Sequence, residues 1–172
     1  MLAAFWLTIR NLTAIALFPG IVVVYIPYRL LNGAAIPGPL DWSMSQYAAA
    51  LVATIGAAIP CRSIWSFAFV GRGTLAPFDE TQVLIVEGFY RFVRNPMYIA
   101  VMLILLAQSM FFWSTVLLSY AGICFVVANI LVIGYEENRL RHKYGNEYRK
   151  YCEHVGRWIP GRPYHHGGSG IG

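Results

Sequence analysis

From Tyr98 to Tyr135 the chain runs for 38 residues without a single Asp, Glu, Lys or Arg. A soluble domain of this size could not cover such a stretch with polar residues, so the stretch favours a membrane protein. It is broken only weakly, by the segment QSMFFWST at 108–115. Because it is too long for one spanning helix and sufficient for two short ones, it predicts a tight helical hairpin. A single long, tilted helix is the alternative, but it would extend far into water.

Two earlier segments, 12–31 and 46–70, are also long and apolar. Pro19, Gly20 and Pro27 predict kinks in the first, and Pro60 predicts a bend near the end of the second. The second segment also offers small residues for close helix contact: Ala49, Ala53, Gly56, Ala57 and Ala58. Only 12% of the chain is charged, against about 25% in soluble domains. We therefore expect an all-α integral membrane protein with about four transmembrane helices.

The basic residues predict how these helices are oriented. Seven follow residue 138, namely Arg139, Arg141, Lys143, Arg149, Lys150, Arg157 and Arg162. The link 72–96 adds Arg72, Arg91 and Arg94, whereas the link 32–45 has none. By the positive-inside rule, the link 72–96 and both termini face the cytoplasm. We expect one domain over 1–172, with two transmembrane helices in 1–71 and a functional core in 72–160.

Other classes of protein fit the chain less well. A signal peptide at 1–31 is disfavoured, because the apolar run is long, contains two prolines and has no clear cleavage site. Cys61, Cys124 and Cys152 are odd in number and predict no disulfide framework. His165 and His166 have no partners at metal-site spacing, so no metal site is expected. The net charge of +5 is better explained by membrane lipids than by nucleic acid, since the basic residues flank the apolar segments.

Polar residues that could carry chemistry gather in two segments expected on the same side of the membrane. In EGFYRFVRNPMY (87–98), Gly88 and the pair Asn95-Pro96 predict a short, bent loop. Tyr90 and Tyr98 bracket this loop with rings that can stack or form hydrogen bonds. In the second segment, 135–160, two adjacent glutamates end the last apolar helix. The simplest interpretation is an ion pair that fastens the loop to this helix.

The order of these motifs resembles a known family. VEGFYRFVRNPMY, the apolar hairpin, EENRL and YGNEYRKYCEHVGRWIP together resemble the superfamily of isoprenylcysteine carboxyl methyltransferases and phospholipid methyltransferases, which are integral membrane enzymes. GTLAPFD at 73–79 is similar to a loop of its bacterial members. The resemblance covers about half the chain, residues 72–160. It implies S-adenosylmethionine as cofactor, a lipid or lipophilic small-molecule substrate, and a bacterial inner membrane.

The resemblance also implies roles for particular residues. Glu136 would bind the charged end of the cofactor. The other cofactor-binding residues would be Gln82, Val83, Leu84, Ile85, Tyr90, Asn95, Pro96, Met97 and Tyr98. Glu137 is the nearest candidate for a base that accepts a proton from the acceptor. Arg94 is the second candidate catalytic residue, as a cation that could engage a substrate carboxylate.

Two positions depart from the family's pattern. Asn95 stands where the most familiar form has His, and its amide cannot titrate near neutral pH. Val132 stands where the prenylcysteine enzymes carry an arginine for the substrate carboxylate, so Arg94 or Arg139 would have to replace that arginine. Arg62 is either a functional intramembrane arginine or a side chain that reaches the interface. The tryptophans are interpreted as interface belt residues: Trp42, Trp65, Trp113 and Trp158.

The sequence thus predicts an S-adenosylmethionine-dependent methyltransferase that acts on a lipophilic acceptor. The main alternative is a membrane binding or scaffold protein with the same fold and no catalysis, which the Asn95 position leaves open. A transporter fits less well, because the chain shows no internal repeat.

Overall fold

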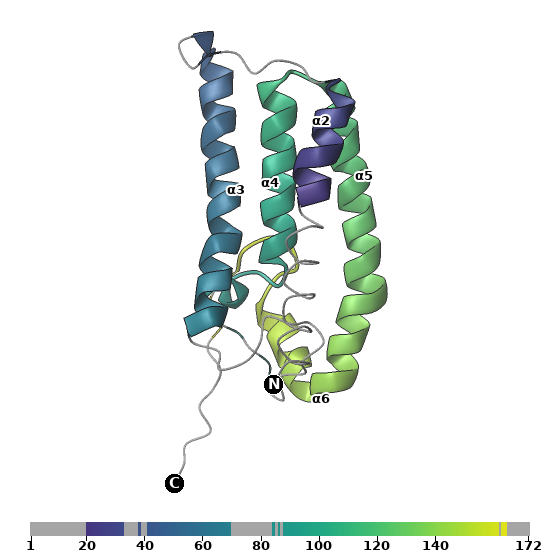
Figure 1. The fold of residues 1–172 in the computed structure, drawn as a ribbon. Helices are drawn as coiled ribbons and strands as arrows, with labels where there is room; N and C mark the ends of the chain where they lie inside the picture. The colour runs from purple at the N-terminus through teal and green to yellow at the C-terminus, as the bar shows by residue number, and fades with distance from the viewer. Residues whose placement is uncertain are drawn as a thin grey trace, which may run out of the picture.

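The structure is a computed structural model that describes residues 20–32, 38, 41–69, 84, 86, 88–161, 163 and 164, with only the backbone for 61–69. The regular structure of these residues is helical, which confirms the all-α class. The elements are η1 (Ile21–Tyr25, π-helical), α2 (Ile26–Leu30), α3 (Met44–Phe69), η3 (Gly88–Arg91, 3-10), α4 (Pro96–Phe111), α5 (Thr115–Leu131), η4 (Val132–Glu136, π-helical) and α6 (Glu137–His154). Figure 1 shows α3, α4 and α5 as long rods standing side by side.

The long apolar stretch folds into the predicted hairpin. Helix α4 ends at Phe111, and α5 begins at Thr115. Trp113 turns the chain in the left-handed region, with φ of 49°. The Ser114 hydroxyl then caps α5 by accepting a hydrogen bond from the Leu117 N–H at 3.3 Å. A single long helix over this stretch is therefore excluded.

Small residues bring α3 and α4 close together, as the sequence predicts for the segment 46–70. Ala49 and Gly56 of α3 are buried, whereas Ala57 and Ala58 are exposed. A Cβ atom added to Gly56 would lie 2.8 Å from Ile104 Cγ1 and 3.1 Å from the Ala100 carbonyl oxygen. Both distances are shorter than normal van der Waals contact, so this position of α3 has no room for a side chain.

We expect Gly56→Leu to lower the free energy of unfolding by about 1–3 kcal/mol, because the added side chain must push α3 and α4 apart. Gly122→Leu is the matched control, since a Cβ at Gly122 would meet no atom within 4 Å. The measurement is thermal unfolding of the two variants in detergent. Equal melting temperatures for both variants would contradict the close contact at Gly56.

A π-helical turn, η1, precedes Pro27, and neighbouring helices satisfy the carbonyls that the proline leaves free; the kink expected at Pro27 stays a prediction. Proline has no N–H, so Pro27 cannot donate to the carbonyls of Val22 or Val23 one turn earlier. These carbonyls accept other hydrogen bonds, from the Tyr120 hydroxyl to Val22 O at 3.0 Å and from Gln108 Nε2 to Val23 O at 2.8 Å. Polar side chains of α4 and α5 thus hold the first helix in place. The part of the expected first helix before residue 20 lies outside the described residues.

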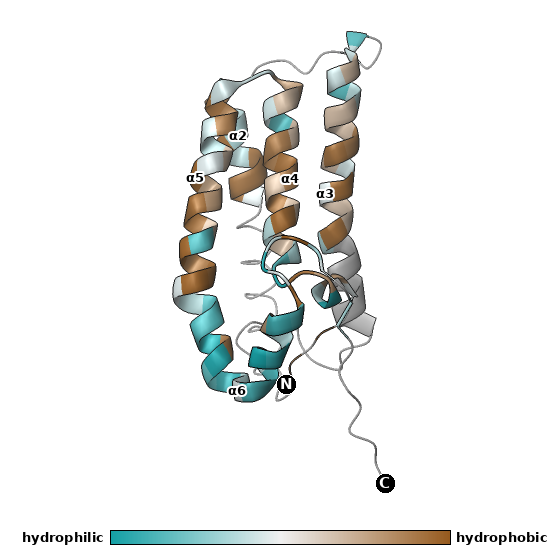
Figure 2. Ribbon diagram, turned by 180° about the vertical axis from the view of Figure 1, so that it is seen from behind, coloured by the Kyte–Doolittle hydropathy of each residue, from teal (hydrophilic) through white to brown (hydrophobic). Residues whose placement is uncertain are grey.

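Helix α5 continues through η4 into α6, which bends at Gly145, where φ is 50° and ψ is −119°. Only glycine adopts this conformation readily. The bend turns the end of α6 back toward the other helices (Figure 1). Hydrophobic residues cover much of α3, α4 and α5, whereas α6 is mostly hydrophilic (Figure 2). The polar residues of the chain are therefore concentrated at one end of the helices.

By length and composition, one described helix, Thr115–His154, could cross a membrane. Three other helices are apolar but shorter, at Ile21–Leu30, Met44–Pro60 and Pro96–Phe111. Four transmembrane helices stay a prediction from the sequence.

Candidate functional site

The loop Gly88–Asn95, which we call the site loop, is held by the C-terminal residues 155–164, which we call the strap. Gly88 has φ of 58°, in the left-handed region that favours glycine, as the sequence predicts for this loop. Three backbone hydrogen bonds join the two segments: Arg94 N–H to Gly156 O at 2.9 Å, Gly161 N–H to Phe92 O at 2.8 Å, and Tyr164 N–H to Arg91 O at 3.0 Å. The site loop begins with the 3-10 helix η3, and the bonds to the strap fix the shape of the part that follows it.

The end of the site loop follows the prediction for Asn95-Pro96. Asn95 ends the loop, and Pro96 is the first residue of α4, where proline is favoured because its missing N–H is not needed. The Asn95 amide donates to the Arg157 carbonyl oxygen at 3.3 Å. In this conformation the side chain that replaces the family's histidine therefore contacts the strap. Pro96 is buried, and Met97 is partly buried beside it.

Two of the predicted cofactor-binding residues are in direct contact. The Tyr98 hydroxyl of α4 donates a short hydrogen bond to Glu136 Oε1 at the end of η4. Burial and then the negative charge of Glu136 raise the pKa of the Tyr90 phenol in the site loop to about 12. A carboxylate beside a phenol ring can bind an ammonium group, and the ring can cover an apolar or aromatic ligand.

The neighbouring glutamate, Glu137, faces a different set of partners. Its Oε1 atom accepts from Arg157 Nε at 2.6 Å and from Arg94 Nη1 at 3.1 Å, and its Oε2 atom accepts from Arg157 Nη2 at 2.9 Å. Arg141 lies 3.7 Å away at the more exposed edge. The Glu137 side chain is only 5% exposed and that of Arg94 12%. We call Arg94, Glu137 and Arg157 the buried ion cluster. It joins the site loop, α6 and the strap.

Electrostatics in this cluster favour a charged Glu137. Burial acts to raise the pKa of the carboxyl group, but the hydrogen bond from Arg157 and the charges of Arg94, Arg157 and Arg141 outweigh it and lower the pKa. A carboxylate that accepts three hydrogen bonds from guanidinium groups is a weak proton acceptor. The geometry thus favours Glu137 as a counterion over the predicted role of base, which stays a prediction, as does the catalytic role of Arg94.

The remaining predicted residues are placed as follows. Leu84 packs against an apolar cluster of Tyr148, Tyr151 and Val155. The Tyr151 hydroxyl also donates to the Tyr90 carbonyl oxygen at 2.6 Å, which ties α6 to the site loop. Val132 is 1% exposed, so the side chain that stands in place of the prenylcysteine enzymes' arginine is fully buried. Gln82, Val83 and Ile85 lie outside the described residues, as does the side chain of Arg62.

Two residues of the site were missed by the sequence interpretation, and both belong to the strap. Arg157 had been counted only as a positive charge, and Trp158 had been assigned to an interface belt. The Trp158 indole is partly buried, and its centroid lies 6.3 Å from that of the Tyr98 ring. The sequence could have indicated both residues, because they lie in VGRWIP, the end of the last segment that resembles the methyltransferase superfamily.

Comparison with known proteins identifies the family. A model of the phospholipid methyltransferase family matches residues 44–147. No curated protein and no solved structure matches the chain. The matched range includes α3, α4, α5, the site loop and both glutamates, and it ends before the strap. Since the match covers more than half of the sequence, the chain belongs to the phospholipid methyltransferase family.

Proposed function

We propose that this protein transfers a methyl group from S-adenosylmethionine to a lipid or lipophilic small molecule. The family implies a methyltransferase and a lipid-like substrate. The observation that carries the proposal is the hydrogen bond between Tyr98 and Glu136, two residues of the family's cofactor pattern, at the end of the apolar helices. An adenosylmethionine ligand needs a carboxylate for its ammonium group and aromatic or apolar cover for its adenine. Both are present at this point.

When bound, S-adenosylmethionine would supply an electrophilic methyl group on its sulfonium. Glu136 binds the ammonium end, and Tyr90 and Tyr98 line the same site. The backbone of Gln82, Val83, Leu84 and Ile85, together with Asn95, Pro96 and Met97, completes the cofactor site proposed from the family's pattern. Their common task is to align the acceptor atom with the methyl group and to exclude water.

Arg94 and Glu137 are proposed to act beside this site. Glu137 holds Arg94 and Arg157 against the site loop. Arg94 is thereby held in the site loop, where its positive charge could attract an anionic group of the acceptor. A carboxylate acceptor needs no base, whereas a protonated amine must first lose a proton. The buried Val132 argues against a prenylcysteine carboxylate bound in the family's usual way.

A bilayer is the proposed surrounding of the helices. Large apolar side chains on α5 are exposed, among them Ile123 at 62%, Val126 at 57% and Ile130 at 65%. Such a face is stable only when apolar material covers it. We propose four transmembrane helices in a bacterial inner membrane, with both termini and the site on the cytoplasmic side, as the distribution of Lys and Arg indicates. A lipophilic acceptor would then enter from the bilayer.

The test is calorimetry of the detergent-purified protein with S-adenosylhomocysteine. We expect saturable binding, and at one hundred times the dissociation constant the ligand should stabilise the protein by about 2.7 kcal/mol. Labelled-methyl transfer to phosphatidylethanolamine, a prenylcysteine analogue and lipophilic amines and thiols would then identify the acceptor. Absence of binding at millimolar ligand would favour the alternative, a scaffold protein with the same fold.

A further inference from the structure

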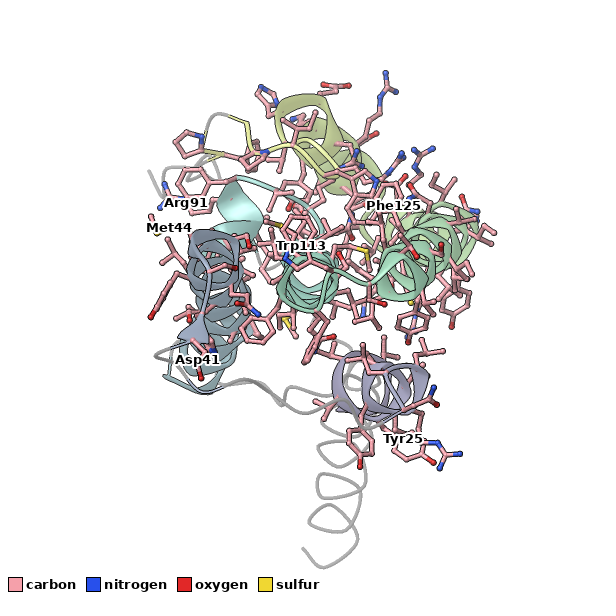
Figure 3. All side chains as sticks on the ribbon, turned by 90° about the horizontal axis from the view of Figure 1, so that it is seen from above. Tyr25, Asp41, Met44, Arg91, Trp113 and Phe125 are labelled. Carbon is pink, nitrogen blue, oxygen red and sulfur yellow. The ribbon has the colours of Figure 1, made fainter. Side chains whose placement is uncertain are left out.

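Three aromatic rings from three separate segments pack in a row, and the first of them, Tyr98, contacts Glu136. The Trp158 ring of the strap stands nearly perpendicular to the Tyr98 ring of α4, at 88°, with centroids 6.3 Å apart. On another side, Trp158 contacts Phe125 of α5, at 5.5 Å and 53°. Figure 3 shows Phe125 over α5 and Arg91 of the site loop on the side of α3. We call Tyr98 and Trp158 the aromatic corner.

The orientation of the Trp158 ring is fixed by hydrogen bonds. Its indole N–H donates to Asn129 Oδ1 at 3.0 Å. The Asn129 amide is itself held, since its Nδ2 donates to the Phe125 carbonyl oxygen one turn earlier at 2.8 Å. A buried indole N–H usually finds a hydrogen-bond partner, and this one is a polar side chain of α5 that also sets the orientation of the ring. Asn129 therefore acts as a positioning residue for the indole.

The charges around the aromatic corner favour a cationic ligand. The faces of aromatic rings carry negative potential and attract cations, most strongly those of tryptophan. The Tyr98 hydroxyl of the corner donates to Glu136, which places a carboxylate next to the Tyr98 ring. The guanidinium group of Arg157, which precedes Trp158 in the strap, is directed to Glu137 and paired with it. Rings and a carboxylate together suit a cation that carries apolar methyl or methylene groups.

We propose that Trp158, together with Tyr98, binds an alkylated onium cation, meaning a positively charged sulfur or nitrogen that bears carbon substituents. This inference rests on the proposed function. Methyl transfer offers two sources for such a group: the sulfonium of the methyl donor, and the ammonium of a methylated acceptor. In both cases the corner would distinguish a charged ligand from its neutral counterpart, because a neutral group of the same shape gains no cation–π attraction.

The test for the first source compares two cofactor forms that differ by one methyl group and one charge. Dissociation constants of S-adenosylmethionine and S-adenosylhomocysteine are measured for the wild type, Trp158→Leu and Trp158→Phe. The preference for the sulfonium form is the ratio of the dissociation constant of S-adenosylhomocysteine to that of S-adenosylmethionine. We expect this ratio to be about three- to thirtyfold smaller in Trp158→Leu than in the wild type. Trp158→Phe should retain part of it. General damage to the site would weaken both ligands and leave their ratio unchanged.

The test for the second source uses dodecyltrimethylammonium and its neutral isostere, in which carbon replaces the charged nitrogen. Protection against thermal unfolding by each compound is compared in the same three proteins. If Trp158→Leu loses the preference for dodecyltrimethylammonium over its neutral isostere, the corner binds the ammonium of the acceptor. If Trp158→Leu loses the preference for S-adenosylmethionine over S-adenosylhomocysteine, the corner binds the sulfonium of the donor. The matched control is Trp42→Leu, since Trp42 is also partly buried but packs against Tyr47 and Phe111.

Unchanged ratios in both pairs of ligands would overturn the inference while leaving the proposed function in place. If the wild type binds neither cofactor form, the proposed function fails, and the inference fails with it. If Trp158→Leu does not fold, Trp158→Phe and Asn129→Leu carry the test, since the first has a smaller ring and the second no longer holds the indole. Unchanged ratios in these two variants would again overturn the inference.

Discussion

Glu137→Gln should lower the free energy of unfolding by about 3–5 kcal/mol, the amount typical when one partner of a buried ion pair is removed. The substitution keeps the shape of the side chain but leaves Arg94 and Arg157 without their shared counterion. Because the Arg94 side chain is only 12% exposed, water cannot replace the lost carboxylate there. The site loop and the strap should separate first. Thermal and denaturant unfolding in detergent would measure the loss.

Glu153→Gln is the control for this substitution. Glu153 pairs with Arg149 at 3.4 Å on the same helix, but both side chains are more than half exposed, at 56% and 78%. Exposed pairs of this kind contribute little to stability. If Glu137→Gln unfolds at the same temperature as Glu153→Gln, the buried ion cluster does not hold the loop and the strap together.

Acid should have the same effect as the Glu137 substitution. The pKa of Glu137 is lower in the folded protein than its ordinary value. The cluster therefore contributes fully to the free energy of unfolding at any pH above about 4.3, the pKa of a glutamate in the unfolded chain. This contribution is lost as the pH falls through the lower pKa that Glu137 has in the folded protein. The difference in melting temperature between the wild type and Glu137→Gln should be constant near neutral pH and shrink in acid. A difference that grows in acid would contradict the assignment.

Glu136→Gln should weaken binding of S-adenosylhomocysteine by about 1.5–3 kcal/mol, or about ten- to 150-fold, as expected for a lost hydrogen bond to a charged group. Stability should change little, because the amide oxygen can still accept from the Tyr98 hydroxyl. Calorimetry gives the affinity, and thermal unfolding without ligand gives the stability. The two glutamates are thus expected to differ, one acting on ligand binding and the other on folding.

Glu147→Gln is the control for the binding experiment, since it removes one negative charge from an exposed position on α6. It should bind S-adenosylhomocysteine as the wild type does. If Glu136→Gln instead binds normally and melts early, Glu136 is an anchor of the fold, and the simpler interpretation as a structural contact is correct.

The local features of the site could be predicted because local rules determine them. Gly88 adopts a conformation that favours glycine, and Pro96 begins a helix as its missing N–H and fixed φ require. Tyr98 and Glu136 were expected at one site through the order of the motifs. The hairpin followed from the length of the apolar stretch, although its turn, at 112–114, could be located only within QSMFFWST.

The contacts of the strap could not be predicted in the same way. Arg157 follows Glu137 by 20 residues and Arg94 by more than 60. No periodic pattern relates such positions, and the sequence contains several other arginines that could have paired with Glu137. The bend at Gly145 decides which of them does, because it turns the second half of α6 back. A single glycine in a polar helix could not have indicated this from the sequence alone.

The π-helical turn before Pro27 has a consequence for how the protein is made. The two donors that its free carbonyls need, on Gln108 and Tyr120, lie 85 and 98 residues later in the chain. During synthesis the first helix therefore emerges long before its partners exist. In a bilayer its two carbonyls would stay unsatisfied, at a cost of several kcal/mol each, until the hairpin of α4 and α5 inserts. If these helices cross a membrane, as proposed, complete insertion of the first helix depends on the second half of the chain, and a nascent chain that stops before the hairpin should be a substrate for membrane quality control.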